Sequence, residues 1–170
     1  DHRPEYLAVG FDTRAPTFRH EAYEAYKATR QKMPEELSVQ YPRIHEFVQT
    51  YPIVLLRQEG VEADDIIGSY AARLAGPDLE VVMVSGDKDF CQVVTEHAKI
   101  LNPGRGGPSG REAHWLGPEG VVERFGVPPS RVVDVLALMG DSSDNVPGVP
   151  GIGEKTASAL IQEFGSLEQL

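Results

Sequence analysis

The sequence predicts an α/β fold with a mostly parallel central sheet flanked by helices, and a C-terminal helix–hairpin–helix subdomain. Short apolar runs at residues 6–11, 53–56 and 80–85 have the length and composition of buried parallel strands. The first two runs are each followed by a helical segment, the order typical of βα units. A turn rich in Pro and Gly at residues 148–153 separates two helical segments near the end.

Composition places the chain among ordinary globular proteins. Its 170 residues are about one domain long, with 41% apolar and 25% charged residues. The single cysteine, Cys91, excludes an internal disulfide bond. Neither a signal region nor a run near the ~18 apolar residues of a membrane span is present. We therefore expect a cytoplasmic monomer with no membrane partner.

Asp12 directly follows the first strand, residues 6–11. It therefore lies at the C-terminal end of that strand, where open α/β sheets bind their ligands. An ordinary turn residue is the alternative for Asp12. In residues 13–33 cations alternate with aromatic rings, which suits single-stranded nucleic acid. A solvated amphipathic helix explains that segment equally well. Residues 35–51 continue as a helix that Pro42 kinks or restarts.

Three carboxylates, Glu62, Asp64 and Asp65, lie at the start of the helix predicted at residues 63–75. One acid in a first helical turn is often only a cap. Three acids so close together repel one another unless a cation intervenes, and a hard metal ion suits them.

Two more acids, Asp87 and Asp89, follow the third strand after Gly86. The alternative for this pair is an Asx-type turn with Asp89 as a helix N-cap. Residues 98–101 then predict an edge strand, and the Gly- and Pro-rich residues 102–111 a mobile loop without chemistry. Helices are expected at residues 118–125, 131–139 and 153–164.

The stretch GDSSDNVPGVPGIGEKTA, residues 140–157, combines acids with a phosphate-binding turn. Asp141 and Asp144 are suited to a divalent cation, whereas a turn ending at a helix N-terminus attracts phosphate. Lys155 and Thr156 supplement its backbone donors. A P-loop is excluded because Glu154 stands in place of its lysine. A tight turn that merely joins two helices is the alternative.

Eight acids thus form an all-oxygen set of candidate ligands, which favours two or more Mg²⁺ or Mn²⁺ ions. They are Asp12, Glu62, Asp64, Asp65, Asp87, Asp89, Asp141 and Asp144. Without them the formal net charge of −10 falls to about −2, so acidity does not exclude a nucleic-acid partner. The five histidines lack the spacing of a zinc site, and no covalent nucleophile signature is present.

Four segments carry a family resemblance: FDTRAPTFRHEAYEAYKATR, GVEADDIIGSYA, GDKDF and GDSSDNVPGVPGIGEKTA. In order and spacing they resemble the 5′-nuclease region of bacterial DNA polymerase I and its flap-endonuclease relatives. The resemblance implies a bacterial protein with a PIN-like nuclease core at residues 1–115, a helical arch at about 13–50, and a DNA-binding subdomain at 116–170. It also implies a C-terminal polymerase domain in the parent chain.

The same resemblance assigns roles to the site residues. The eight acids would bind metal, Lys27 and Arg30 would orient the scissile phosphate, and Tyr26 would stack on a base. The hairpin would hold the duplex backbone, with K⁺ bridging carbonyls and phosphate. Its residues are Gly148, Gly151, Gly153, Lys155 and Thr156.

Family members begin with a strand that ends in a further metal-binding Asp, so we expect a chain truncated at its N-terminus. The expected function is metal-dependent, structure-specific 5′-nuclease activity on DNA with a 5′ flap or a single-strand/duplex junction, in replication and repair. Two alternatives stay open. One is a non-catalytic fragment that binds DNA junctions, and the other is a metal-dependent ribonuclease on a similar scaffold.

Overall fold

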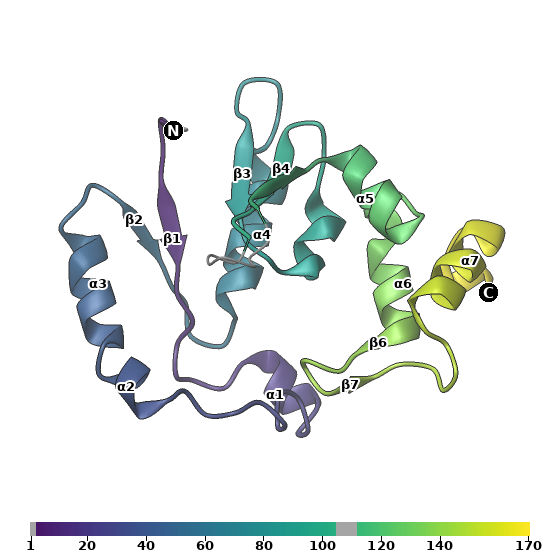
Figure 1. The fold of residues 1–170 in the computed structure, drawn as a ribbon, viewed down its shortest axis with the longest axis horizontal. Helices are drawn as coiled ribbons and strands as arrows, with labels where there is room; N and C mark the ends of the chain where they lie inside the picture. Colours follow the sequence, from purple (N-terminus) through teal and green to yellow (C-terminus); the bar gives the residue numbers. More distant parts are fainter. Residues whose placement is uncertain (1–2, 105–111) are drawn as a thin grey trace. The chain divides into compact units, whose positions relative to one another are not determined.

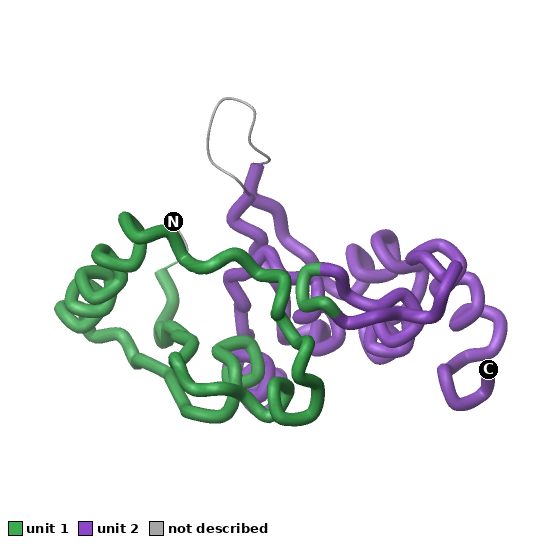
Figure 2. The backbone as a smooth tube through the Cα atoms, turned by 90° about the horizontal axis from the view of Figure 1, so that it is seen from below, with its two compact units in different colours: residues 1–66, 143–145 green, residues 67–142, 146–170 purple. Residues whose placement is uncertain are grey.

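The computed structural model describes residues 3–104 and 112–170 (Figure 1). Most of the loop predicted at residues 102–111 lies outside the described residues. Contacts divide the chain into two compact units, coloured separately in Figure 2. Unit 1 contains Asp1–Ile66 with Ser143–Asn145, and unit 2 contains Ile67–Ser142 with Val146–Leu170. Each unit is described by itself.

Unit 1 is built on two short parallel strands, β1 (Ala8–Gly10) and β2 (Val54–Leu56). Its helices are α1 (Phe18–Ala22), α2 (Glu35–Ser38) and α3 (Tyr41–Gln49). Pro42 lies in the first turn of α3, so it starts a second helix. This is one of the two outcomes predicted for Pro42, the other being a kink in a continuous helix.

Two expectations for unit 1 are wrong. The strand at residues 6–11 is not buried, since Tyr6 is 73% exposed, and Val54 on β2 is 59% exposed. A two-stranded sheet offers little cover, and among the described residues α1, α2 and α3 bury no side chain. The amphipathic helix proposed as an alternative for residues 13–33 is also absent from the described segment, because α1 ends at Ala22 and Tyr23 is extended.

Unit 2 contains a sheet in which β4 (Ala98–Asn102) lies between β3 (Val81–Val84) and β5 (His114–Leu116). β3 and β4 run parallel, whereas β5 pairs antiparallel with β4. The prediction of an edge strand at residues 98–101 is therefore wrong, because Trp115 and Leu116 belong to a strand that covers that edge.

The hydrophobic core of unit 2 joins this sheet to the helices around it. Helix α4 (Ala63–Leu74) contributes Ala71, β3 contributes Met83 and β4 contributes Ile100, all at most 2% exposed. The 3₁₀ helix η1 (Lys88–Val93) adds Phe90 and Cys91 to the same core. This packing fixes the C-terminal end of β3, where Asp87 and Asp89 lie.

The C-terminal part of unit 2 is helical, as the sequence predicts. Its elements are α5 (Pro118–Phe125), η2 (Pro129–Arg131), α6 (Val132–Met139), α7 (Glu154–Phe164) and η3 (Leu167–Gln169). Val135 and Leu138 of α6 pack in the core with Ala157 and Ile161 of α7. Between these helices β6 (Gly140–Asp141) pairs antiparallel with β7 (Val146–Pro147).

The predicted fold class is confirmed: the chain is α/β, with parallel strand pairs, flanking helices and a helical C-terminal part. Over the described residues, no helix is both long and apolar enough to cross a membrane.

Candidate functional site

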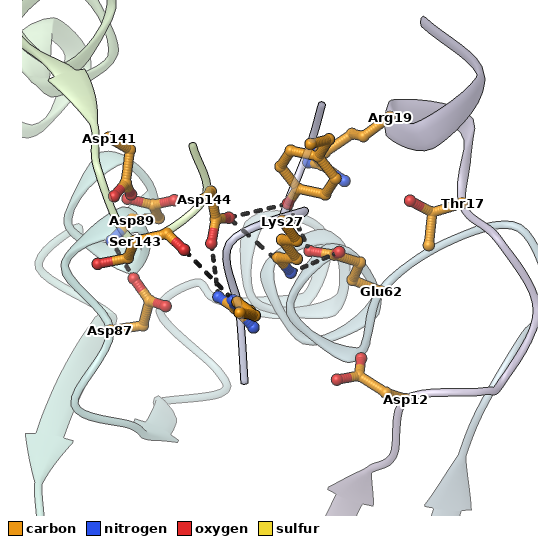
Figure 3. Close-up of polar contacts among 12 residues, drawn as sticks. Asp12, Thr17, Arg19, Lys27, Glu62, Asp87, Asp89, Asp141, Ser143 and Asp144 are labelled. Carbon is orange, nitrogen blue, oxygen red and sulfur yellow. Dashed lines mark hydrogen bonds and ion pairs between the residues drawn. The ribbon is translucent and has the colours of Figure 1, made fainter. Parts of the chain in front are cut away.

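In unit 1, Glu62 is held by two side chains from the segment after α1 (Figure 3). The Lys27 Nζ lies 2.6 Å from Glu62 Oε1, and the Tyr26 hydroxyl donates a 3.1 Å hydrogen bond to Oε2. Both ends of the Lys27–Glu62 pair are largely buried, at 17% and 13% side-chain exposure. Desolvation makes such a pair sensitive to the loss of either partner.

Asp144 is bound by the same segment, as Figure 3 shows. The Tyr26 hydroxyl donates to its Oδ2 at 2.9 Å, and Arg30 Nη2 lies 2.5 Å from its Oδ1. Burial and the hydrogen bond to Asp144 raise the pKa of Tyr26 far above its usual value. Tyr26 is therefore a neutral donor that joins two carboxylates, Glu62 and Asp144.

The backbone around Lys27 is unusual. Lys27 has a φ of 56°, a left-handed conformation that costs a non-glycine residue about 1 kcal/mol or more. Its N–H donates to the Asp144 carbonyl at 2.9 Å, and Asn145 Nδ2 donates to the Ala25 carbonyl at 2.7 Å. These bonds connect residues 143–145 with the segment after α1 and keep the Lys27 side chain over Glu62.

Two other acids of unit 1 stabilise the start of α4. Asp12 Oδ1 accepts from the N–H of Ala63 at 2.8 Å, and Asp65 Oδ2 accepts from the N–H of Glu62 at 2.9 Å. Asp65 thus makes the capping contact that is the alternative for an acid in a first helical turn, and Asp12, which follows β1, accepts from the same helix start. Arg19 also forms a bidentate pair with Asp65, both distances being 2.7 Å, and this hydrogen bonding lowers the pKa of Asp65. Asp64 lies in the first turn of the same helix.

Unit 2 contributes a cluster of three acids and one lysine, Asp87, Lys88, Asp89 and Asp141, which we call the Lys88 cluster. Lys88 Nζ lies 2.5 Å from Asp141 Oδ2 and 3.5 Å from Asp89 Oδ1. Asp87 Oδ1 accepts from the N–H of Asp89 at 2.9 Å. The predicted Asx-type turn is therefore present, with Asp87 as the N-cap of η1 in place of Asp89.

The charges of the Lys88 cluster shift its pKa values. Burial raises the pKa of Asp89, and the negative charges of Asp87 and Asp141 add to that effect. Burial works against the Lys88 ammonium, but the hydrogen bond to Asp141 and the surrounding carboxylates outweigh it and raise the pKa of Lys88. The lysine is therefore a permanent cation at neutral pH.

Asp141 is positioned by a close backbone approach that requires glycine. Gly140 ends α6 with a φ of 73°, and a Cβ placed on it would lie 2.2 Å from the Gly148 nitrogen. A Cβ on Gly148 would lie 2.3 Å from the Met139 carbonyl carbon. Gly148 therefore has a packing role, in addition to the predicted DNA-binding role.

The remaining hairpin glycines are open. Among the described atoms, none lies within 4 Å of a Cβ built on Gly151 or Gly153, and Gly151 has a φ of 81°. Gly153 is the N-cap of α7, whose first turn carries Lys155 and Thr156. Lys155 also lines an open groove of about 260 Å³ together with Arg124. The first N–H groups of a helix have no partner within that helix, so the start of α7, the open glycines and the two cations fit contact with a phosphate backbone.

The eight candidate ligands fall into both units. Five belong to unit 1 and three to unit 2. Within the described ranges, no three His, Cys, Asp or Glu side chains are arranged to hold a metal ion. Protein cations contact five of the eight acids: Lys27, Arg30, Arg19 and Lys88 contact Glu62, Asp144, Asp65, Asp89 and Asp141. The donor set nevertheless fits a hard divalent cation, because every donor is a carboxylate oxygen.

Sequence reasoning missed two of the cations that pair with these acids, Arg19 and Lys88. Arg19 is one of several cations in residues 13–33, and sequence reasoning assigns neither it nor Lys88 a role. For Lys88 a signal was available, since it stands between Asp87 and Asp89, where carboxylates attract a cation. The bridging role of Tyr26 depends on a contact 118 residues away, which the sequence does not reveal.

Carboxylates at strand ends and helix starts, on an α/β scaffold that ends in an open glycine hairpin, define the chain as a nuclease-type domain. Residues 1–126 match the family model described as "5'-3' exonuclease, N-terminal resolvase-like domain". Residues 127–170 match "5'-3' exonuclease, C-terminal SAM fold". The chain belongs to the 5′-3′ exonuclease family.

Curated relatives confirm the predicted resemblance. The chain is 44% identical over its full length to DNA polymerase I of Bacillus caldotenax, of which it covers 19%. It is 47% identical over 159 residues to DNA polymerase I of Pseudomonas aeruginosa, which is 94% of this chain and 17% of the relative. The chain thus spans about a fifth of the length of these relatives.

Solved structures show the same fold. The T5 D15 protein co-crystallised with metal ions matches with a TM-score of 0.76 and 25% identity, over 97% of this chain and 64% of that one. The bacteriophage T5 flap endonuclease in a complex with DNA and metal ions gives a TM-score of 0.77 at 25% identity, over 97% and 62%. The catalytic core of Rad2 with DNA, at 17% identity and a TM-score of 0.55, supports the fold alone.

Proposed function

We propose that this chain is a divalent-metal-dependent, structure-specific 5′-nuclease domain. It hydrolyses DNA phosphodiester bonds near 5′ flaps or single-strand/duplex junctions, in replication and repair. The observation that carries the proposal is electrostatic: among the described residues, five of the eight candidate acids hold a protein cation. Within each unit these acids attract positive charge, and a divalent ion neutralises carboxylates more completely than lysine or arginine does.

The metal ligands in this proposal are the eight acids Asp12, Glu62, Asp64, Asp65, Asp87, Asp89, Asp141 and Asp144. When bound, Mg²⁺ or Mn²⁺ would lower the pKa of a water molecule and stabilise charge on the departing oxygen. The two T5 structures contain metal ions, which supports a metal-dependent mechanism for this chain.

Lys27 and Arg30 bind and orient the scissile phosphate in this proposal. Their salt bridges to two candidate metal ligands of unit 1 support this role, because a phosphate bound to the metal would lie near both cations. Tyr26 stacks on a base of the DNA in this proposal, which requires a movement of its side chain. The residue is 6% exposed, so it stacks on a base only after the side chain has left the hydrogen bonds of its hydroxyl to Glu62 and Asp144.

The hairpin binds the duplex backbone independently of sequence. Gly151 and Gly153 leave open space beside free N–H groups at the start of α7, and Lys155 adds a charge. Carbonyl groups of the turn would hold a K⁺ ion against a phosphate. The proposed boundary between the nuclease core and this subdomain is at residues 115/116. We also propose that a polymerase domain follows in the parent chain, because the relatives are named DNA polymerase I.

The test is cleavage of a 5′-flap DNA with Mg²⁺ or Mn²⁺, compared with EDTA. We expect a product with a 5′-phosphate, lost in EDTA and in the double variant Asp87→Ala/Asp141→Ala. Asp78→Ala is the matched control, since this exposed acid lies in a turn outside the candidate set. Equal cleavage in EDTA, or by the double variant, contradicts the proposal.

One observation favours a second candidate, a non-catalytic module that binds DNA junctions. Over the described part of the chain, five of the eight acids are paired with protein cations, and no three are arranged to hold a metal ion. The two candidates differ in turnover. Binding of flap DNA in Ca²⁺ without any product in Mg²⁺ or Mn²⁺ would support the second candidate.

A further inference from the structure

Lys88 is the basic residue at the centre of the Lys88 cluster, and the proposed function gives it no role. It begins η1 directly after β3, between Asp87 and Asp89 in sequence. Its ammonium group contacts the carboxylates of two elements: Asp89 Oδ1 of η1 at 3.5 Å and Asp141 Oδ2 of β6 at 2.5 Å. Figure 3 labels the three acids.

The position of Lys88 differs from that of a surface ion pair. The side chains of Lys88 and Asp141 are 22% and 20% exposed, whereas the pair between Lys99 and Glu80 in the same unit is 39% and 68% exposed. Less solvent around the Lys88 pair means weaker screening and a stronger interaction. The contact therefore holds the start of η1 against the end of β6.

The net charge of the Lys88 cluster indicates the role of its lysine. Three carboxylates and one ammonium group give the Lys88 cluster a net charge of −2, with Asp87 acting on Lys88 through its negative charge. One divalent ion matches that charge. The ion and the ammonium group, however, need the same oxygens of Asp89 and Asp141, and like charges repel at such short range.

We propose that Lys88 is the internal counter-cation of this acid cluster, and that a divalent ion displaces its ammonium group when it binds Asp89 and Asp141. This inference rests on the metal-dependent function proposed above. Lys88 has two opposite effects: it stabilises the metal-free protein, and it lowers the affinity for metal. It is a positioning residue that acts through the two carboxylates.

The test uses the whole chain and Mn²⁺, with bound metal measured by electron paramagnetic resonance and unfolding by circular dichroism in EDTA. Lys88→Met removes the charge at similar length, and Lys88→Arg keeps it. Lys99→Met is the matched control, because it removes a lysine from an exposed ion pair of the same unit.

We expect Lys88→Met to bind Mn²⁺ roughly tenfold more tightly, the effect of removing one charge about 6 Å from a divalent ion at the permittivity of water. In EDTA its melting temperature should fall by about 2–4 °C. Lys88→Arg and Lys99→Met should both bind Mn²⁺ like the wild type. A merely structural role would lower stability without raising the affinity for metal.

Unchanged or weaker Mn²⁺ binding by Lys88→Met overturns the inference and leaves the proposed function intact. Tighter binding by Lys88→Arg also overturns it, because that variant keeps the charge, and this arm remains informative if Lys88→Met fails to fold. No Mn²⁺ binding by the wild type overturns the metal-dependent function, and this inference with it.

Discussion

Replacing each of two hairpin glycines with alanine should affect different properties: stability at Gly148 and DNA affinity at Gly153. At Gly148 a Cβ would lie 2.3 Å from the Met139 carbonyl carbon, 2.4 Å from its oxygen and 2.5 Å from the Gly140 nitrogen. Ordinary carbon contacts begin near 3.5 Å, so relief requires a backbone shift of about 1 Å. We expect Gly148→Ala to cost about 3 kcal/mol.

Gly153 is the comparison for Gly148, because an alanine side chain at this position meets no steric obstacle among the described atoms. Among the described atoms none lies within 4 Å of a Cβ built on it, and its φ of −96° suits any residue. Alanine is a poorer N-cap than glycine but restricts the unfolded chain, so Gly153→Ala should change stability by less than about 1 kcal/mol. The added methyl group should nevertheless keep a phosphate from approaching the start of α7.

Thermal unfolding and duplex binding separate the two roles. For a chain of this length, about 3 kcal/mol corresponds to a fall in melting temperature of about 6–12 °C for Gly148→Ala. Gly153→Ala should melt near the wild type, yet bind duplex DNA more weakly in fluorescence anisotropy. A neutral Gly148→Ala, or a Gly153→Ala that loses stability and not affinity, refutes this account of the hairpin.

Three further outcomes are expected. Lys27→Ala and Arg30→Ala should lower cleavage about 10²-fold or more and duplex binding far less, because these cations act on the phosphate at the reaction site. Gly151→Val should weaken binding to all duplex sequences alike, since a β-branched residue is strained at a φ of 81° and fills the open side of the turn. The Cys91 thiol should resist alkylation in the folded protein, because it is fully buried and burial raises its pKa.

These outcomes have direct checks. Single-turnover cleavage and anisotropy, measured on the same flap DNA, compare the two cation variants, and equal losses in both would reduce them to general DNA contacts. A panel of unrelated duplexes tests Gly151→Val, and a sequence-dependent loss would speak against a backbone clamp. Iodoacetamide labelling followed by mass spectrometry tests Cys91, and rapid labelling without denaturant would show that this core opens.

Much of the fold follows from local signals in the sequence. Apolar runs locate the strands, and proline with glycine bounds α5, whose C-cap Gly126 has a φ of 71°. Burial of β1 could not be predicted from its own residues, because cover depends on what else packs on the sheet. The central place of β4 likewise depends on its pairing with β5, a strand that comes later in the chain.

The sequence predicted which acids are candidate ligands, but it could not predict which side chains pair with them. Acid-rich segments identified the eight candidate ligands, whose roles remain predictions. Their pairing depends on tertiary structure: Asp141 and Asp144 are three residues apart, yet Asp141 packs within unit 2 and Asp144 within unit 1. No local pattern separates them, since the division arises from the bonds of Asp144 to Tyr26 and Arg30.

The most direct test of the central claim, that these carboxylates hold catalytic metal, is a crystal structure of the chain soaked with Mn²⁺, with anomalous scattering used to locate the ions. The account predicts anomalous peaks within about 2.5 Å of candidate carboxylate oxygens, including Asp89 and Asp141, with the Lys88 ammonium group moved away from them. Manganese absent from all eight carboxylates at saturating concentration, or bound only elsewhere, would contradict it.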